Sequence, residues 1–262
     1  MNYCNYHTHT TFCDGANTAE EMVLAAIQDG CPELGFSGHS YFSFDPSWNM
    51  SPSTMKEYQK EVLRLKEKYK DQISIRLGLE YDIQSEGVNP ADYDYLIGAA
   101  HCVFKDGHYI PVDLGYAELS QALSLYYDGD AYAFAEDYYK EVAKIYEKTH
   151  CQIIAHFDLV TKCIECGLAL DIRNPRYRAA AEAALDTLLQ APVLFEINTG
   201  AISRGYRTTP YPDEMLLARI ADAGGSVILA SDSHATDTIT YGFDDAMKLV
   251  KKYGLNLVSR LD

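Results

Sequence analysis

The chain has 262 residues, of which 47% are hydrophobic, and its 22 basic and 38 acidic side chains give a net charge of −16. This length suits one large α/β domain with a full core. The charge argues against a general nucleic-acid or anionic-membrane surface, which would need a basic face. No apolar stretch reaches 18 residues and no secretory signal opens the chain, so the seven cysteines favour reduced thiols and a cytoplasmic location.

Short apolar runs alternate with longer helical patterns, which predicts βα units and a mainly parallel sheet. In chain order we expect a strand at 3–7, a helix at 18–27, a strand at 33–37, a helix at 53–70, strands at 73–80 and 95–100, a helical stretch at 116–148, a strand at 151–155, a helix at 176–190, a strand at 193–198, a helix at 212–223, and strands at 226–231 and 255–258. Seven such units predict one domain, residues 1–262, that forms a closed or nearly closed barrel. An open doubly wound sheet is the alternative, although no glycine-rich dinucleotide loop follows the first strand.

Two of these helices carry features of their own. Thr18 and Glu21 form a capping box at the start of the first helix. The stretch 116–148 mixes many tyrosines with acidic residues, which is typical of an amphipathic helix that uses tyrosine as half-buried cover. The alternative is a lid that offers aromatic and acidic contacts to a cationic ligand.

Cys163 and Cys166 form a lone CxxC, which helix packing explains better than zinc or redox chemistry.

Polar residues stand at the ends of the predicted strands. Six of the eight histidines and two acids lie at or just after such ends: His7, His9, His39, Glu80, His101, His156, Asp232 and His234. In a parallel barrel all carboxyl ends of the strands open onto one face, so these residues would meet in one mouth. Asp14, in the loop after the first strand, could reach the same place. In the first strand, alternation points His7 and His9 to one side.

This set makes nine candidate metal ligands. One catalytic metal takes about three protein ligands, so nine suit two or three metals. Imidazole combined with carboxylate favours zinc, manganese or iron and does not choose among them.

The motifs resemble those of the PHP (polymerase and histidinol phosphatase) family. His7-Thr8-His9 resembles the HxH motif near the N-terminus, and Ser231-Asp232-Ser233-His234 resembles the DxH motif near the C-terminus. Between them stand Gly38-His39-Ser40, Glu80, Ala100-His101 and Ala155-His156. The resemblance spans nearly the whole chain and implies a distorted (β/α)7 TIM-like barrel that binds three divalent transition-metal ions.

The resemblance also implies which residues hold each ion. The first metal would be held by His7, His9, Glu80 and Asp232, the second by Glu80 as a bridge with His101 and His156, and the third by Asp14, His39 and His234. No ligand is missing, so we do not expect an inactive relative.

Glu196–Gly200 followed by Arg204–Pro212 resembles the free-standing histidinol-phosphatase branch, whereas polymerase-associated members are usually domains of far longer chains. This segment follows a predicted strand and so lies on the predicted metal face. There Arg204 and Arg207 can bind phosphate bidentately, and the alternative is surface arginines on a long loop. Lys162 stands where the branch tends to carry a basic phosphate contact.

The expected reaction is hydrolysis of a small phosphate monoester, for which the resemblance implies L-histidinol phosphate. Bound metals would activate water and clamp the oxygens of an in-line displacement. Asp232 and His234 would orient the attacking water or handle its proton, and Arg204 would neutralise charge on the phosphoryl oxygens. We expect no nucleic-acid or membrane partner.

Three alternatives remain open. Phe42, Phe44, Asp45 and Trp48 follow His39 and could line a pocket for the cationic end of the substrate, or they could form a loop packed for stability. A PHP-type phosphatase or phosphodiesterase acting on nucleotides or DNA ends is the second enzyme hypothesis. A metal-holding structural protein would need closed coordination, against which nine ligands spread over strand ends argue.

Overall fold

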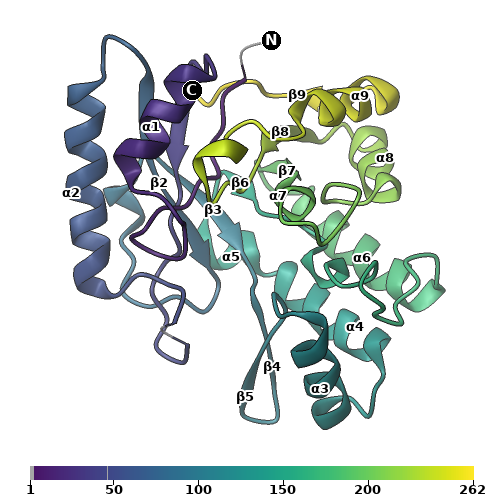
Figure 1. Ribbon diagram of the computed structural model, residues 1–262. Helices are drawn as coiled ribbons and strands as arrows, with labels where there is room; N and C mark the ends of the chain where they lie inside the picture. Colours follow the sequence, from purple (N-terminus) through teal and green to yellow (C-terminus); the bar gives the residue numbers. More distant parts are fainter. Residues whose placement is uncertain (1–2, 46) are drawn as a thin grey trace.

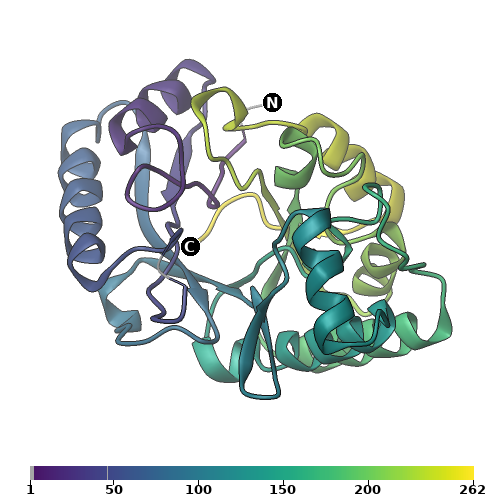
Figure 2. The ribbon, with the colours of Figure 1, turned by 60° about the horizontal axis from the view of Figure 1, so that its bottom comes forward.

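The computed structural model describes residues 3–45 and 47–262, which form a curled parallel sheet surrounded by helices (Figure 1). The strands of this sheet are β1 (Glu33–Phe36), β2 (Ser74–Asp82), β3 (Tyr95–Ala99), β6 (Ile153–Ile154), β7 (Leu194–Asn198), β8 (Ser226–Ala230) and β9 (Asn256–Leu257). They pair in the order β1-β2-β3-β6-β7-β8-β9, each parallel to its neighbours. Figure 2 shows the strands inside a ring of helices. The predicted distorted α/β barrel is confirmed.

The expected strand at 3–7 is wrong as a regular strand. Asn5 forms an isolated parallel bridge with Leu34 of β1, and Thr8 forms one with Ser233 just beyond β8. The segment therefore pairs first with β1, at one edge of the sheet, and then with the residue that follows the carboxyl end of β8, and neither ladder grows long enough to count as a strand. The structural consequence is that residues 5–8 close the barrel on the side where β1 and β8 would otherwise stay apart.

Helices cover the outer face of the sheet. Their bounds are α1 (Ala19–Gln28), α2 (Pro52–Lys68), α3 (Tyr116–Tyr126), α4 (Ala131–Val142), α5 (Ile145–Thr149), α6 (Pro175–Leu188), α7 (Gly200–Ser203), α8 (Glu214–Asp222) and α9 (Phe243–Tyr253). The capping box of α1 is present, with Glu21 N donating to Thr18 Oγ1 and Thr18 N donating to Glu21 Oε2. Sequence analysis did not predict α9. Among the described residues, no helix combines the length and apolarity needed to cross a membrane.

The predicted helical stretch 116–148 is three helices rather than one. Asp128 and Gly129 adopt positive φ angles of 52° and 80° and separate α3 from α4. Tyr138 and Tyr139 are almost completely buried, and Tyr139 Oη lies 2.6 Å from Tyr177 Oη of α6. These tyrosines are therefore core residues at the α4–α6 contact.

Tyr95 of β3 fills the interior of the barrel. A side chain at Gly35 or Gly78 would come within 2.3 Å of the Tyr95 side chain, so glycine in β1 and β2 makes room for it. The Tyr95 hydroxyl donates to the backbone oxygens of Tyr6 and Phe36. Tyr95 thus packs the barrel interior below its mouth.

A hairpin extends the chain beyond β3. It consists of β4 (Cys102–Lys105) and β5 (His108–Pro111), which pair antiparallel to each other and not with the main sheet. The hairpin and α3 project together beyond the barrel in Figure 1.

Candidate metal centre

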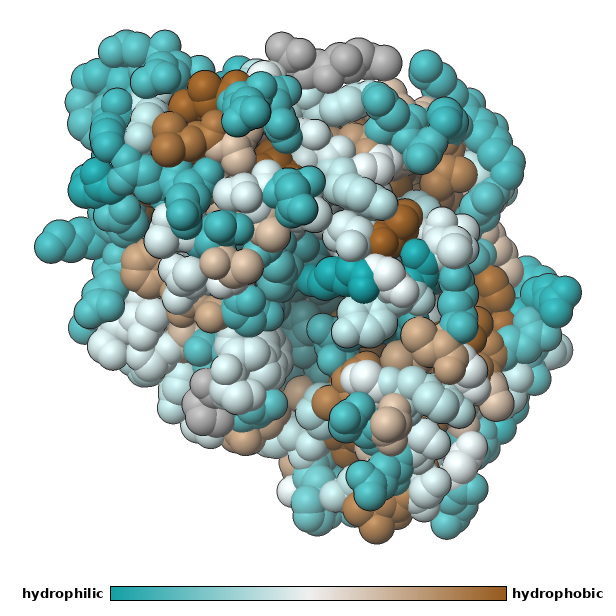
Figure 3. Space-filling view, viewed as in Figure 1, coloured by the Kyte–Doolittle hydropathy of each residue, from teal (hydrophilic) through white to brown (hydrophobic). Residues whose placement is uncertain are grey.

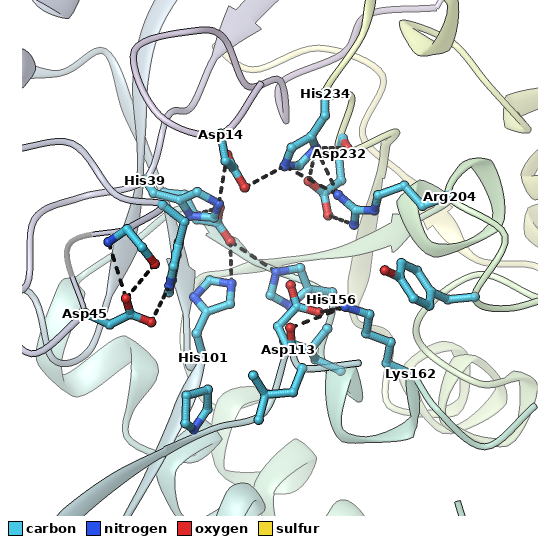
Figure 4. Close-up of a pocket in the computed structure, with 17 residues that line it drawn as sticks. Asp14, His39, Asp45, His101, Asp113, His156, Lys162, Arg204, Asp232 and His234 are labelled. Carbon is cyan, nitrogen blue, oxygen red and sulfur yellow. Dashed lines mark hydrogen bonds and ion pairs between the residues drawn. The ribbon is translucent and has the colours of Figure 1, made fainter. Parts of the chain in front are cut away.

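The nine predicted ligands lie together at the carboxyl ends of the strands. Figure 4 labels six of them: Asp14, His39, His101, His156, Asp232 and His234. Three groups of ligand atoms lie within 4.8 Å of one another: His9, Asp14, His39 and His234; His7, His9 and Asp232; and His39, Glu80 and His101. His156 joins them because its Nε2 lies 3.1 Å from Glu80 Oε1. Residues that are up to 227 positions apart in the sequence therefore share one site.

Glu80 occupies the centre of this set. Its Oε1 atom lies 3.1 Å from His156 Nε2 and 3.3 Å from His101 Nε2. Its Oε2 atom lies 2.9 Å from His39 Nδ1 and 3.2 Å from His7 Nε2. The two carboxylate oxygens thus face different histidines, which is the arrangement expected of a carboxylate that bridges two cations.

Unpaired buried atoms test whether the set fits a metal. His7 Nε2, His9 Nε2 and Glu80 Oε2 are buried and have no hydrogen-bond partner among the described residues. His7 Nε2 and Glu80 Oε2 lie only 3.2 Å apart without forming a hydrogen bond, so both atoms face a shared space. Leaving such a group unpaired costs about 1–3 kcal/mol. Divalent cations would satisfy all three atoms, and nitrogen with carboxylate oxygen suits zinc, manganese or iron.

Two buried acids orient the ligand histidines, and sequence analysis assigned neither of them a role. Glu196 Oε1 lies 2.7 Å from His7 Nδ1, and Asp82 Oδ2 lies 3.0 Å from His101 Nδ1. An acid on Nδ1 fixes the tautomer that leaves Nε2 free for a metal. Both acids lie near the carboxyl end of a strand, the same signal that identified Glu80.

Charge differs among the ligand histidines. Burial, together with the nearby His234 and His39, lowers the pKa of His9 to about 3. Burial also opposes the charge of His39, but Glu80 and Asp14 raise its pKa to about 9. Burial opposes ionisation of Glu80, and the surrounding histidines hold its pKa well below the ordinary value. Without metal, the site therefore holds a neutral His9, a protonated His39 and an ionised Glu80. A divalent cation would displace the proton of His39 when it binds.

The cluster lies at the base of a hydrophilic cavity of about 410 Å³, seen as the central hollow in Figure 3. Arg204 and Lys162, both predicted substrate contacts, lie on its wall. Arg204 Nη2 donates to Asp232 Oδ2 at 3.0 Å, and Arg204 Nη1 lies 2.9 Å from His234 Nδ1. Lys162 Nζ lies 4.2 Å from the centre of the Tyr206 ring. Two cationic groups therefore face the same space as the ligand cluster.

Arg207, also a predicted substrate contact, is placed differently. It is not among the described residues that line the cavity, and its side chain is buried. Its guanidinium donates to Thr161 and Thr209 and lies 3.8 Å from Asp158 Oδ2. Asp158 is fully buried and needs a cation nearby. Arg207 therefore joins the loop after β7 to the loop after β6, and its role as a substrate contact stays a prediction.

The loop after His39 divides into two parts. Asp45 and Trp48 line the cavity, and Trp48 Nε1 donates to Asp45 Oδ2 at 3.0 Å. The Trp48 ring lies edge-on to His39, with centroids 4.6 Å apart. Phe42 and Phe44 stack on each other instead, and Phe44 stacks on Tyr109 of β5. The cavity wall thus takes one acid and one aromatic ring from this loop.

No part of 116–148 is among the described residues that line the cavity. The hypothesis that this stretch forms a lid therefore has no support from the cavity lining. Cys163 is buried and Cys166 exposed, and both are free thiols.

Known proteins resemble this chain in sequence and in fold. The PHP domain family model matches residues 5–200. A Schizosaccharomyces pombe protein named "Probable histidinol-phosphatase" is 26% identical, with 98% of this chain and 88% of that protein covered. The "Histidinol-phosphatase" of Bacillus subtilis is 22% identical, with 91% and 96% covered. A crystal structure of histidinol phosphate phosphatase from Lactococcus lactis, complexed with Zn, L-histidinol and phosphate, has the same fold, with a TM-score of 0.70, 19% identity, and 98% and 95% covered.

Proposed function

The chain belongs to the PHP domain family, and we propose that it is a metal-dependent phosphatase that hydrolyses L-histidinol phosphate to L-histidinol and phosphate, a step in histidine biosynthesis. The observation that carries this proposal is a cavity lined by seven of the nine candidate metal ligands together with Arg204 and Lys162, with the other two, His7 and His9, next to them. Metals and cationic side chains that face one cavity suit a small phosphate ester. The relatives with this activity span nearly the whole chain, which supports the same substrate here.

We propose three divalent transition-metal ions as the cofactors. Zinc is bound in the Lactococcus lactis protein, and the donor set here equally suits manganese or iron. The assignment is His7, His9, Glu80 and Asp232 for the first ion, Glu80, His101 and His156 for the second, and Asp14, His39 and His234 for the third. Such ions supply Lewis acidity to the phosphoryl group and to the attacking water.

The chain's own residues bind and orient the reactants. Arg204 and Lys162 bind the non-bridging phosphoryl oxygens and neutralise the charge that develops there. Asp232 holds Arg204 in place and helps to orient the attacking water. As the water oxygen bonds to phosphorus, the ester P–O bond breaks and the leaving alkoxide takes up one proton. His234, whose side chain is 20% exposed at the cavity, can pass the proton that the attacking water loses to the solvent.

Phosphate release and metal content, measured on the same sample, test this proposal. The substrates are L-histidinol phosphate, nucleoside monophosphates and 4-nitrophenyl phosphate. We expect the highest kcat/KM for L-histidinol phosphate. Equal or higher values for nucleotides would contradict the substrate while leaving the phosphatase class in place. His9→Ala should lose both metal and rate, and a variant that keeps both would contradict the site.

The location of the protein is also a proposal. All seven cysteines lie within the described residues and are free thiols. Free thiols fit a reducing compartment, so we place the protein in the cytoplasm.

A further inference from the structure

Asp113 brings a carboxylate next to a cation of the cavity wall. It lies two residues beyond β5, and its side chain is 43% exposed where it lines the cavity. Its Oδ1 atom accepts a hydrogen bond from Lys162 Nζ at 2.6 Å (Figure 4). In the described part of the chain, Lys162 is the only residue that donates to this side chain.

An acid at this position needs an explanation. The charged wall residues outside the predicted ligand set are Asp45, Asp113, Lys162 and Arg204. A carboxylate that touches the Lys162 ammonium competes with phosphate oxygens for it and repels them. A site built for phosphate alone would therefore gain nothing from Asp113.

The two wall acids differ in how they are satisfied. Asp45 Oδ1 accepts from Ser47 Oγ at 2.6 Å, and Asp45 Oδ2 accepts from Trp48 Nε1 at 3.0 Å. Both oxygens of Asp45 are thus occupied within its own loop. Asp113 has one partner, and that partner is a residue that phosphate would attract away. When phosphate binds Lys162, the Asp113 carboxylate loses its partner and becomes free to bind another cation.

We propose that Asp113 is a specificity-determining residue that binds the ammonium group of an aminated phosphate ester. The proposal rests on the proposed function for the position of the phosphate and deepens it by naming the residue that selects the amine. In L-histidinol phosphate only two carbons separate the ester oxygen from the amino nitrogen. An ester whose phosphate contacts Lys162 therefore places its ammonium close to Asp113.

Two further features of the wall agree with this assignment. Partial desolvation at the cavity wall opposes the charge of Asp113, but Lys162 and Arg204 lower its pKa below the ordinary value, so it is ionised at neutral pH. Pro111, Leu114 and Leu159 line the cavity near it and offer an apolar surface to the remainder of the ligand.

The test compares an amine-bearing ester with its matched amine-free analogue. The purified, metal-loaded enzyme is assayed with L-histidinol phosphate and with 3-(imidazol-4-yl)propyl phosphate, which has the same three-carbon chain and lacks only the amine. The quantity measured is the ratio of the two kcat/KM values. We expect the wild type to prefer the amine and Asp113→Asn to lower that preference by about 10- to 100-fold, the worth of one hydrogen-bonded charge. An unchanged ratio, with both values reduced alike, would overturn the proposal because it would mean that Asp113 only positions Lys162.

Asp45→Asn is the matched control, since it neutralises the other acid on the same wall. We expect this variant to keep the wild-type ratio. If Asp45→Asn abolishes the preference and Asp113→Asn does not, the ammonium site lies at Asp45 and the proposal is overturned.

A second pair of esters separates this proposal from the proposed function. O-phosphoethanolamine carries the ammonium at the same distance from phosphate without an imidazole, and ethyl phosphate lacks the amine. If the wild type rejects L-histidinol phosphate but prefers O-phosphoethanolamine, and Asp113→Asn removes that preference, the proposed substrate fails and the role of Asp113 stands. If the wild type prefers neither aminated ester, the role of Asp113 is overturned.

Discussion

Glu33 and Glu80 are buried carboxylates on neighbouring strands, at opposite ends of the barrel. Glu33 begins β1 and is satisfied by its own chain: Tyr6, Ser74 and Arg260 donate to it, and Arg76 Nε lies 3.4 Å away. Glu80, near the carboxyl end of β2, has an Oε2 atom without a hydrogen-bond partner among the described residues.

The two buried carboxylates differ in what compensates their negative charge. A buried carboxylate costs stability unless donors and cations of the fold complete it, as they do at Glu33. Glu80 is surrounded by imidazoles whose nitrogens face the same space, an environment that the proposed divalent cations would complete. The amino end of the barrel thus completes its buried charge from the chain itself, and the carboxyl end fits a binding site.

Replacing Glu80 should have the largest effect. Glu80→Gln removes the charge that two metal positions share, so we expect metal content to fall and kcat to drop by more than the ~100-fold typical of losing a residue that only orients a ligand. Metal analysis and phosphate release measure the two effects, and circular dichroism checks the fold. A variant with wild-type metal content and rate would contradict the role of Glu80 in metal binding, on which its contrast with Glu33 depends.

Glu196→Gln should have the next largest effect. It keeps the shape of the side chain but weakens the hold on His7 Nδ1, at 2.7 Å, so metal affinity should fall about 10- to 100-fold. Competition with a chelator measures this affinity. An affinity equal to that of the wild type would mean that Glu196 belongs with Glu33 as a purely structural acid.

Glu33→Gln should change stability and not catalysis. The variant loses the charge that Arg260 and Arg76 pair with, and we expect the free energy of unfolding to fall by about 1–3 kcal/mol. Urea denaturation measures this loss. Metal content and kcat/KM should match the wild type, because Glu33 lies at the opposite end of the barrel. A loss of bound metal would show that the two ends are coupled.

The smallest effect is the pH dependence of the Glu33 contribution. Burial opposes ionisation, but Ser74, Tyr6 and Arg260 lower the folded-state pKa of Glu33 below its ordinary value of 4.5. The unfolded chain therefore binds the proton first as the pH falls, so this stabilisation is complete above pH 4.5 and is lost below it. In metal-free protein, the difference in unfolding free energy between wild type and Glu33→Gln should shrink below pH 4.5. A difference that stays constant through this range would contradict the lowered pKa.

Strand ends predicted that the nine candidate ligands lie together, because parallel strands deliver their carboxyl ends to one face whatever the details of packing. The same reasoning did not reach Asp113, because it follows the β4–β5 hairpin, which leaves the alternation of strand and helix. It also placed Arg207 on the cavity wall, since a loop position does not reveal which way a side chain turns.

The amino-acid sequence by itself determined the order of the strands, the ligand chemistry and the face on which the ligands gather. Periodicity and residue type are local properties, and the parallel topology follows from them. Only the tertiary structure decided which atoms meet. It places Glu80 between two sets of histidines. It places Glu196 and Asp82 against His7 and His101, and it pairs Arg207 with Asp158 outside the cavity lining. Those choices depend on how residues 5–8 close the barrel and on which buried charge lies nearest, and neither is a property of any one segment.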